Sequence, residues 1–180
     1  RQMTSYAAGA DTTPLLEETI GHNFERTASA HPDVEALVDV PSGRRWTYAE
    51  LDAEIDVVAR ALMGSGIRQG DRVGIWAPNC AEWTILQYAT AKAGAILVTI
   101  NPAYRTHELA YVLEHSGARL LVSATEFKGS DYRSMVAEVR ADAPDLAEVV
   151  FLGSDDWEQL CRRADRVTAE QTIEGLTIPR

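Results

Sequence analysis

Four short apolar stretches, separated by segments with helical spacing, constrain the fold of this chain most strongly. They are RVGIW (72–76), AILVTI (95–100), RLLVS (119–123) and EVVFLG (148–153). Strands that are apolar on both faces and alternate with helices predict a parallel sheet covered by helices on both sides. Each crossover is long enough for a right-handed βαβ connection. We therefore expect an α/β fold with a mainly parallel sheet, built from repeated βαβ units.

Apolar residues at helical spacing mark the segments between these strands. The segment from Ala81 to about Ala93 is apolar nearly all round, which predicts a helix in the interior. A second helix is expected from Thr106 to Ser116, ended by Gly117, with Leu109, Val112 and Leu113 buried. A further helix is marked by Tyr132, Met135, Val136 and Val139. A last helix, capped by Ser154, is expected to carry Trp157, Leu160, Cys161 and Ala164 on one face.

The N-terminal part follows a different pattern, an expected helix and then a β-hairpin. From Pro14 apolar residues recur at helical spacing until His31-Pro32-Asp33 ends the helix. EALVDV (35–40) and RWTY (45–48) flank the turn sequence PSGR, which predicts two antiparallel strands. The apolar positions of the expected helix are Leu16, Ile20, Phe24 and Ala28.

Thr47 and Glu50 form a capping-box pattern at the start of the next helix. The Thr47 side chain can accept a hydrogen bond from the N–H of the third helical residue, while the Glu50 side chain reaches back to the N–H of the cap residue. Gly64 or Gly66 is expected to end this helix. The face that it buries is expected to consist of Leu51, Ile55, Val58, Ala59 and Leu62. The chain thus divides into a disordered segment (1–13), an α/β subdomain (14–164) and a linker (165–180).

The net charge of −10 excludes classes of partner that need a cationic surface. It argues against non-specific nucleic-acid binding and against electrostatic docking to an anionic membrane. The two cysteines have no metal-ligand spacing, so neither a zinc site nor a disulfide framework is expected. No apolar run reaches the roughly 18 residues of a membrane span, and the polar start lacks a signal-peptide pattern. We expect a cytoplasmic protein.

The stretch GDRVGIWAPNCAEW (70–83) has the strand–loop–helix order that often holds phosphates. The chain contains no Walker motif, and GSGIRQG (64–70) follows a helix where a dinucleotide loop would follow a strand. The loop after the strand has no glycine, so its backbone cannot approach a phosphate closely. Pro78 and Asn79 instead indicate a structural turn, with Asn79 as the expected helix N-cap.

Cys80 is a candidate nucleophile, because a helix N-terminus can lower a thiol pKa. A free cysteine is more often a buried apolar residue, and we expect Cys80 to be largely buried and Cys161 to lie in the core. His107 and His115 are eight residues apart, whereas a helical metal pair has a spacing of four. We expect both to face solvent.

The acidic cluster at Asp155, Asp156 and Glu158 is explained by the dipole of a helix first turn. Tyr104 and Arg105 are expected to be loop residues before a cap at Thr106. Local chemistry therefore identifies no catalytic, cofactor-binding or metal-binding residue in this chain.

Two long segments taken together resemble the acyl-adenylate-forming enzymes. They are WTYAELDAEIDVVARALMGSGIRQGDRVGIWAPNCAEW and AKAGAILVTINPAYRTHELAYVLEHSGARLLVSA. The part INPAYRTHELAYVLEHSGAR is most similar to fatty-acid–CoA ligases. The resemblance covers about residues 24–151 and corresponds to the start of such enzymes.

The resemblance implies an activity that joins a fatty acid to ATP, releases pyrophosphate and passes the acyl group to coenzyme A, with Mg²⁺ accompanying the ATP. It implies a Thr/Ser/Gly-rich phosphate loop that ends in lysine, an acidic residue on the ribose, and a C-terminal lysine. No position of this chain matches any of these. We expect the loop to follow residue 180, and the chain alone to be inactive.

The expected partner of the chain is the remainder of its own enzyme, with the fatty acid as the substrate of the full-length protein. The subdomain face exposed without that remainder is expected to favour self-association. Alternative hypotheses are a non-catalytic α/β interaction module, a remnant of an interrupted ligase gene, and a thiol enzyme built on Cys80.

Overall fold

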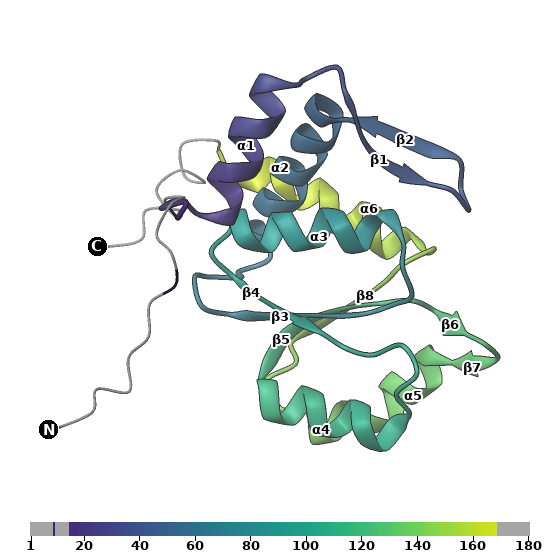
Figure 1. The fold of residues 1–180 in the computed structure, drawn as a ribbon. Coiled ribbons are helices and arrows are strands. Elements are labelled where there is room, and N and C mark those ends of the chain that lie inside the picture. The colour runs from purple at the N-terminus through teal and green to yellow at the C-terminus, as the bar shows by residue number, and fades with distance from the viewer. Residues whose placement is uncertain (1–8, 10–14, 169–180) are drawn as a thin grey trace, which may run out of the picture.

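The expected parallel sheet is present in the computed structural model, which describes residue 9 and residues 15–168 (Figure 1). Its strands are β3 (Arg72–Trp76), β4 (Ile96–Thr99), β5 (Ala118–Ser123) and β8 (Glu148–Phe151). They are all parallel and lie in the order β4-β3-β5-β8. The α/β class and the four predicted strands are confirmed.

Side chains of β3 alternate between the two faces of the sheet, as the twofold period of a strand requires. Val73 and Ile75 point into one buried cluster, and Trp76 points into the other. Gly74 lies between them, where an added Cβ would lie 3.1 Å from a methyl carbon of Leu121. The sheet therefore has two separately packed faces.

Helices cover both faces (Figure 1). The first face is covered by α2 (Tyr48–Gly64), α3 (Ala81–Lys92) and α6 (Asp155–Cys161), and α1 (Ile20–Ala30) packs on α2 and α3. The second face packs against α4 (Thr106–Ser116) and α5 (Tyr132–Val139). Two 3₁₀ helices, η1 (Arg140–Asp142) and η2 (Arg162–Arg166), follow α5 and α6.

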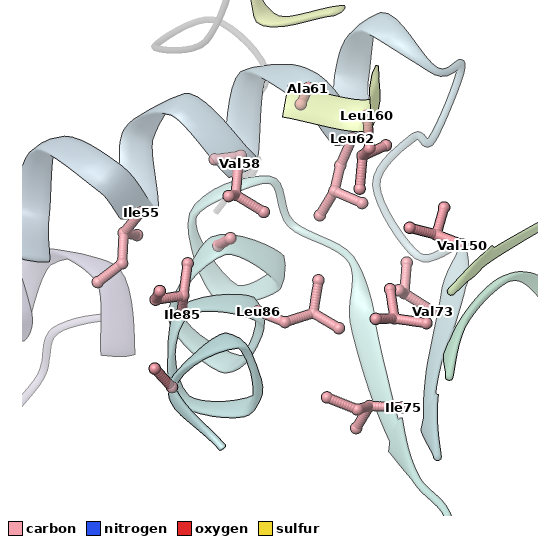
Figure 2. Packing of buried hydrophobic residues seen from close by; sticks show 14 of the residues in the cluster. Ile55, Val58, Ala61, Leu62, Val73, Ile75, Ile85, Leu86, Val150 and Leu160 are labelled. Atoms are coloured by element: carbon pink, nitrogen blue, oxygen red, sulfur yellow. The ribbon is translucent and has the colours of Figure 1, made fainter. Parts of the chain in front are cut away.

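The core of the first face is mostly aliphatic (Figure 2). Ile55 and Leu62 of α2 and Ile85 and Leu86 of α3 are all fully buried. Within α3 only Gln87 is exposed, so the prediction that this helix lies in the interior is confirmed. The predicted buried face of α2 is confirmed, and the apolar residues that marked α5 are buried. In α4, Leu109 and Leu113 are buried as predicted, but Val112 is only partly buried.

The predicted capping box starts α2. The Glu50 N–H donates to Thr47 Oγ1 at 3.3 Å, and the Thr47 N–H donates to a Glu50 carboxylate oxygen at 2.8 Å. The helix ends at Gly64, and a Cβ added there would lie 2.5 Å from the carbonyl oxygen of Arg163. Glycine at this position therefore allows η2 to pack directly on α2.

The predicted start of the first helix is wrong. The helix α1 begins at Ile20, six residues after Pro14, and Thr19 caps it by accepting a hydrogen bond from the His22 N–H. Phe24 and Ala28 are buried as expected, but Leu16 and Ile20 are 71% and 62% exposed. Leu16 and Ile20 have the spacing of one helical face, but no described residue covers that face.

The predicted N-terminal hairpin is confirmed as β1 (Glu35–Asp39) paired antiparallel with β2 (Arg44–Thr47). A second hairpin, β6 (Glu126–Phe127) with β7 (Ser130–Asp131), was not predicted. Its turn places Lys128 and Gly129 at φ angles of 48° and 79°. Strands of two residues are too short to show an apolar alternation, so only the glycine in the turn indicates them.

The two flanking segments of the proposed division lie largely outside the described residues. Apart from Gly9, the expected disordered segment 1–13 is not described, and neither is the linker beyond residue 168. The helix η2 continues to Arg166, past the predicted end of the subdomain at residue 164. The three-part division stays a prediction.

Candidate functional site

A hollow of about 300 Å³ lies at the carboxyl ends of β3 and β4. The hollow adjoins β3, the strand at which the chain order reverses, since β4 and β5 follow each other in sequence but lie on opposite sides of β3. The reversal itself lies between β3 and β5. In open α/β sheets, ligands bind outside the carboxyl ends of the strands at such a reversal. The hollow is lined by Ala77, Asn79, Trp83, Thr99, Ile100, Asn101, Pro102 and Tyr104.

The lining is aromatic, apolar and amide in character. Trp83 and Tyr104 offer rings, and Asn79 and Asn101 offer amides. The Asn101 side-chain oxygen is already used, since it accepts the Ala103 N–H at 2.9 Å. The described lining contains no carboxylate, imidazole, thiol or ammonium group. The hollow can contact a ligand or another polypeptide segment, and the hydroxyl-bearing side chains in its lining are Thr99 and Tyr104.

Asn79 lines this hollow and does not cap α3, so the predicted cap is wrong. The helix begins at Ala81, one residue later than the predicted cap requires, and Cys80 occupies the N-cap position with extended backbone angles. The Cys80 side chain makes no capping hydrogen bond. Asn79 therefore lies one position too early to reach the free N–H groups, and its side chain is exposed.

Cys80 is partly buried, less than the predicted largely buried thiol. Burial, helped by the nearby carboxylates of Glu82 and Asp39, raises the pKa of its thiol to about 11. The thiol is therefore protonated near neutral pH. Because the thiolate is the nucleophilic form, this environment does not favour the thiol-enzyme hypothesis.

The other sequence candidates are mostly where the sequence predicts them. Cys161 packs at the margin of the first-face core and is partly buried. His107 and His115 are both exposed on α4, and the His115 ring stacks on Tyr111 at 5.3 Å. The acidic residues of α6 occupy its first turn after the predicted cap at Ser154. Asp156 has a further role, since its carboxylate accepts the Phe151 N–H.

The loop that precedes α4 is more organised than predicted. Arg105, and not Thr106, is the N-cap residue, and its N–H donates to the Glu108 carboxylate at 3.0 Å. The Arg105 guanidinium also donates to the hydroxyl of Ser130 on β7. The loop between β4 and α4 is therefore tied to the second hairpin, a contact across 25 residues that local patterns cannot indicate.

Two buried aromatic residues donate hydrogen bonds to the backbone of the loop between β4 and α4. Trp76, at the end of β3, and Tyr132, at the start of α5, stack with ring centres 3.5 Å apart and planes at 1°. Trp76 Nε1–H donates to the Asn101 carbonyl at 3.1 Å, and the Tyr132 hydroxyl donates to the Pro102 carbonyl. Sequence reasoning placed both residues in their elements but missed the pairing.

The described residues do not fit a nucleotide phosphate at the start of α3. The loop has no glycine, and the first turn of the helix already holds an anionic side chain, Glu82. That carboxylate pairs with Arg44 of β2 at 2.5 Å. Within the described part of the chain, no group of three or more His, Cys, Asp or Glu side chains is suited to a metal ion.

Across residues 15–168, none of the helices combines the length and the apolar character that a membrane span requires. The fold defines the class of the structure, an open α/β sheet with helices on both faces. A family model described as AMP-binding enzyme matches residues 24–174. The chain belongs to this family, as the resemblance predicted.

Curated relatives are named as acyl-CoA ligases or synthetases. The mitochondrial medium-chain acyl-CoA ligase ACSF2 of Macaca fascicularis is 42% identical over 135 residues, which are 75% of this chain and 22% of that protein. YngI of Bacillus subtilis, named as an acyl-CoA synthetase, is 42% identical over 184 residues, covering 90% of this chain and 34% of its own.

A solved structure agrees with these relatives. The crystallised N-terminal domain of FACL13 from Mycobacterium tuberculosis has a TM-score of 0.73 and 26% identity, over 81% of this chain and 36% of that domain. The chain thus corresponds to the N-terminal region of acyl-CoA ligases. It spans about a fifth to a third of the length of the curated relatives given above.

Proposed function

We propose that this chain is the N-terminal part of an ATP-dependent fatty-acid–CoA ligase and is inactive by itself. The observation that carries the proposal is the family match over residues 24–174, in a chain that spans only 22% and 34% of two relatives. The hollow at the carboxyl edge supports the proposed inactivity, because its lining has no charged side chain to hold ATP or Mg²⁺.

The complete ligase would use ATP, Mg²⁺ and coenzyme A. A carboxylate oxygen of the fatty acid attacks the α-phosphorus of ATP, and pyrophosphate leaves. The thiol sulfur of coenzyme A then attacks the acyl carbonyl, loses its proton, and AMP leaves. No step of this sequence is assigned to residues of this chain, since the start of α3 does not fit a phosphate. Their role is to build the sheet and present its carboxyl edge.

The remainder of the enzyme is the proposed partner. Leu16, just before α1, and Ile20, its first residue, are exposed, and Ile96 on the edge strand β4 is 53% exposed. Large exposed apolar side chains that gather in patches mark surfaces that another polypeptide covers. Without that cover, the same surfaces would favour self-association of the chain, which the dependence of its sedimentation on concentration tests.

We propose a cytoplasmic location for the full-length enzyme. The name of the ACSF2 relative includes "mitochondrial", which makes the mitochondrion the competing location. Fractionation of the source cells with an antibody against residues of α4 decides between the two. The same blot gives the mass of the native protein. A mass near that of the relatives supports the ligase, and a native chain of 180 residues favours an interaction module or a gene remnant.

Pyrophosphate exchange tests the proposed inactivity. The purified 180-residue chain is incubated with ATP, Mg²⁺, labelled pyrophosphate and a panel of fatty acids from short to long. We expect no exchange above a protein-free blank with any acid, and exchange by the complete ligase with at least one. A cooperative urea transition of the chain shows that a negative result comes from a folded protein. Exchange by the folded chain alone would overturn the proposed inactivity.

A further inference from the structure

Trp76 and Tyr132 form an unusual pair for a sheet-and-helix core. Both side chains are completely buried, yet each carries one polar hydrogen that must find an acceptor. The two acceptors are neighbouring carbonyls, those of Asn101 and Pro102, in the loop that follows β4. One loop is therefore fixed by side chains from two elements that are 56 residues apart in the chain.

The next two residues of the loop both bond to Asn101. The Tyr104 N–H donates to the Asn101 carbonyl at 3.0 Å, beside the Trp76 bond, and the Ala103 N–H donates to the Asn101 side chain. Displacement of Asn101 or Pro102 would therefore move Tyr104, whose side chain lines the hollow. The aromatic pair determines where one wall of the hollow stands.

The stack itself supplies the rigidity. Its rings are parallel to within 1° and lie inside the second-face core, between β3 and α5. Burial also raises the pKa of the Tyr132 phenol, so the hydroxyl keeps its proton and remains a donor across the physiological pH range. Buried polar groups that are fully paired fix a single arrangement of their neighbours.

We propose that Trp76 and Tyr132 are positioning residues of the ligase, which set the Asn101–Tyr104 wall at the carboxyl edge where a substrate or a substrate-bearing segment binds. Neither residue touches the ligand. They act through the loop backbone. This inference rests on the proposed function, because it assumes that the carboxyl edge of the sheet faces the ligands of the complete enzyme.

The test uses Tyr132→Phe and Trp76→Phe in the complete ligase. Tyr132→Phe keeps the ring stack and removes only the bond to Pro102, and Trp76→Phe removes the bond to Asn101. We expect the KM for at least one of ATP, fatty acid and coenzyme A to rise about tenfold, with kcat changed less than about threefold. Normalisation to active enzyme separates this split from a simple loss of folded protein.

Tyr88→Phe is the matched control. Tyr88 also lies in an aromatic contact, 4.4 Å from the Phe24 ring, but it belongs to α3 on the opposite face of the sheet. The Tyr88→Phe variant should leave the KM values for ATP, fatty acid and coenzyme A unchanged. If both loop variants also leave them within twofold of the wild type, the positioning role is wrong. A wild-type ligase that forms no acyl-CoA would instead contradict the proposed function.

A second measurement tests, independently of the ligase assay, whether the Tyr132 hydrogen bond fixes the backbone of the loop. In the 180-residue chain, amide hydrogen exchange followed by NMR reports on Ala103 and Tyr104. We expect Tyr132→Phe to speed their exchange about tenfold or more, with no change for core amides of β5, and Tyr88→Phe to have no effect. Unchanged protection of Ala103 and Tyr104 in Tyr132→Phe would overturn the inference whatever the ligase assay gives.

Discussion

The two faces of the central sheet are packed by different means. The first face is a broad aliphatic layer beneath α2, α3 and α6 (Figure 2), and a buried cation lies where α1 packs on α2 and α3. The second face lies beneath α4 and α5, and its distinctive feature is the Trp76–Tyr132 stack tied to a loop. The difference teaches that both faces contribute side chains to the carboxyl edge, while the second face adds hydrogen bonds from a buried aromatic pair to the loop after β4.

Lys92 is the cation of the first face, and it joins three helices. Its side chain is 2% exposed, and its ammonium lies 2.7 Å from Asp52, 2.6 Å from Asp56 and 3.1 Å from Glu25. Gly21 of α1 allows the Lys92 stem to pass, because a Cβ there would lie 3.2 Å from Lys92 Cγ. The network holds α1 and α2 against the end of α3.

The largest expected effect comes from a cavity in the aliphatic layer. Ile85→Ala should lower the free energy of unfolding by about 3 kcal/mol, because Ile85 is fully buried and its neighbours cannot all move into the space. Urea denaturation measures the loss, and Ile85→Val is the control, with an expected loss of about 1 kcal/mol. A loss below that of the valine control would show that the first face is loosely packed.

Lys92→Met should cost about 2 kcal/mol. The methionine keeps the apolar stem but leaves three carboxylates without their cation, and their partial exposure limits the cost. Burial alone lowers the pKa of Lys92, but the hydrogen bonds to Asp52 and Asp56 outweigh it and raise the pKa above its ordinary value.

The raised pKa of Lys92 fixes the sign of a pH effect. The folded state binds this proton more tightly than the unfolded state does. The stabilisation is therefore complete below the ordinary lysine pKa of about 10.4 and is lost as the pH rises through the higher folded value. Urea titrations at pH 8 and pH 11 should show a smaller difference between wild type and Lys92→Met at pH 11. A difference independent of pH would contradict the network.

Gly64→Ala should destabilise the chain by about 1 kcal/mol, although alanine usually stabilises a helix by about as much relative to glycine. The added Cβ would meet the carbonyl oxygen of Arg163, which is backbone and cannot swing away. Thermal unfolding gives the sign directly. A raised Tm would mean that η2 does not pack on α2 as described.

The smallest expected effect is that of Cys80→Ala, a loss of about 0.5 kcal/mol with no change in any ligase activity. The thiol itself should react with a disulfide reagent at pH 8 roughly 100-fold more slowly than an ordinary cysteine, because its pKa is about 11. Fast labelling of Cys80, with Cys161→Ser as the background, would reopen the thiol-enzyme hypothesis.

Elements whose signals are local were predictable from the sequence. The strands β3, β4, β5 and β8 each read as an apolar run between helices, and the Thr47–Glu50 box is defined by two residues three apart. The start of α1 was misplaced because the apolar spacing of Leu16 and Ile20 does not show whether anything covers them. Asn79 is a residue type that favours the N-cap position, but the helix starts at Ala81 and the N-cap is therefore Cys80. The residue type does not show at which of two neighbouring positions the helix begins.

The candidate site was less predictable than the fold. The hollow combines the ends of β3 and β4, whose order in the sheet cannot be seen in the sequence. The stack of Trp76 on Tyr132 joins residues far apart in the chain. Sequence reasoning about single motifs could find neither, because both arise from tertiary packing.

Pyrophosphate exchange by the folded 180-residue chain tests the central claim most directly. The chain should unfold cooperatively in urea and yet show no ATP–pyrophosphate exchange with any fatty acid, as expected of the N-terminal part of a ligase whose chemistry resides in the remainder. Exchange above the protein-free blank with even one acid would contradict the claim, because it would place a complete acid-activating site within these 180 residues.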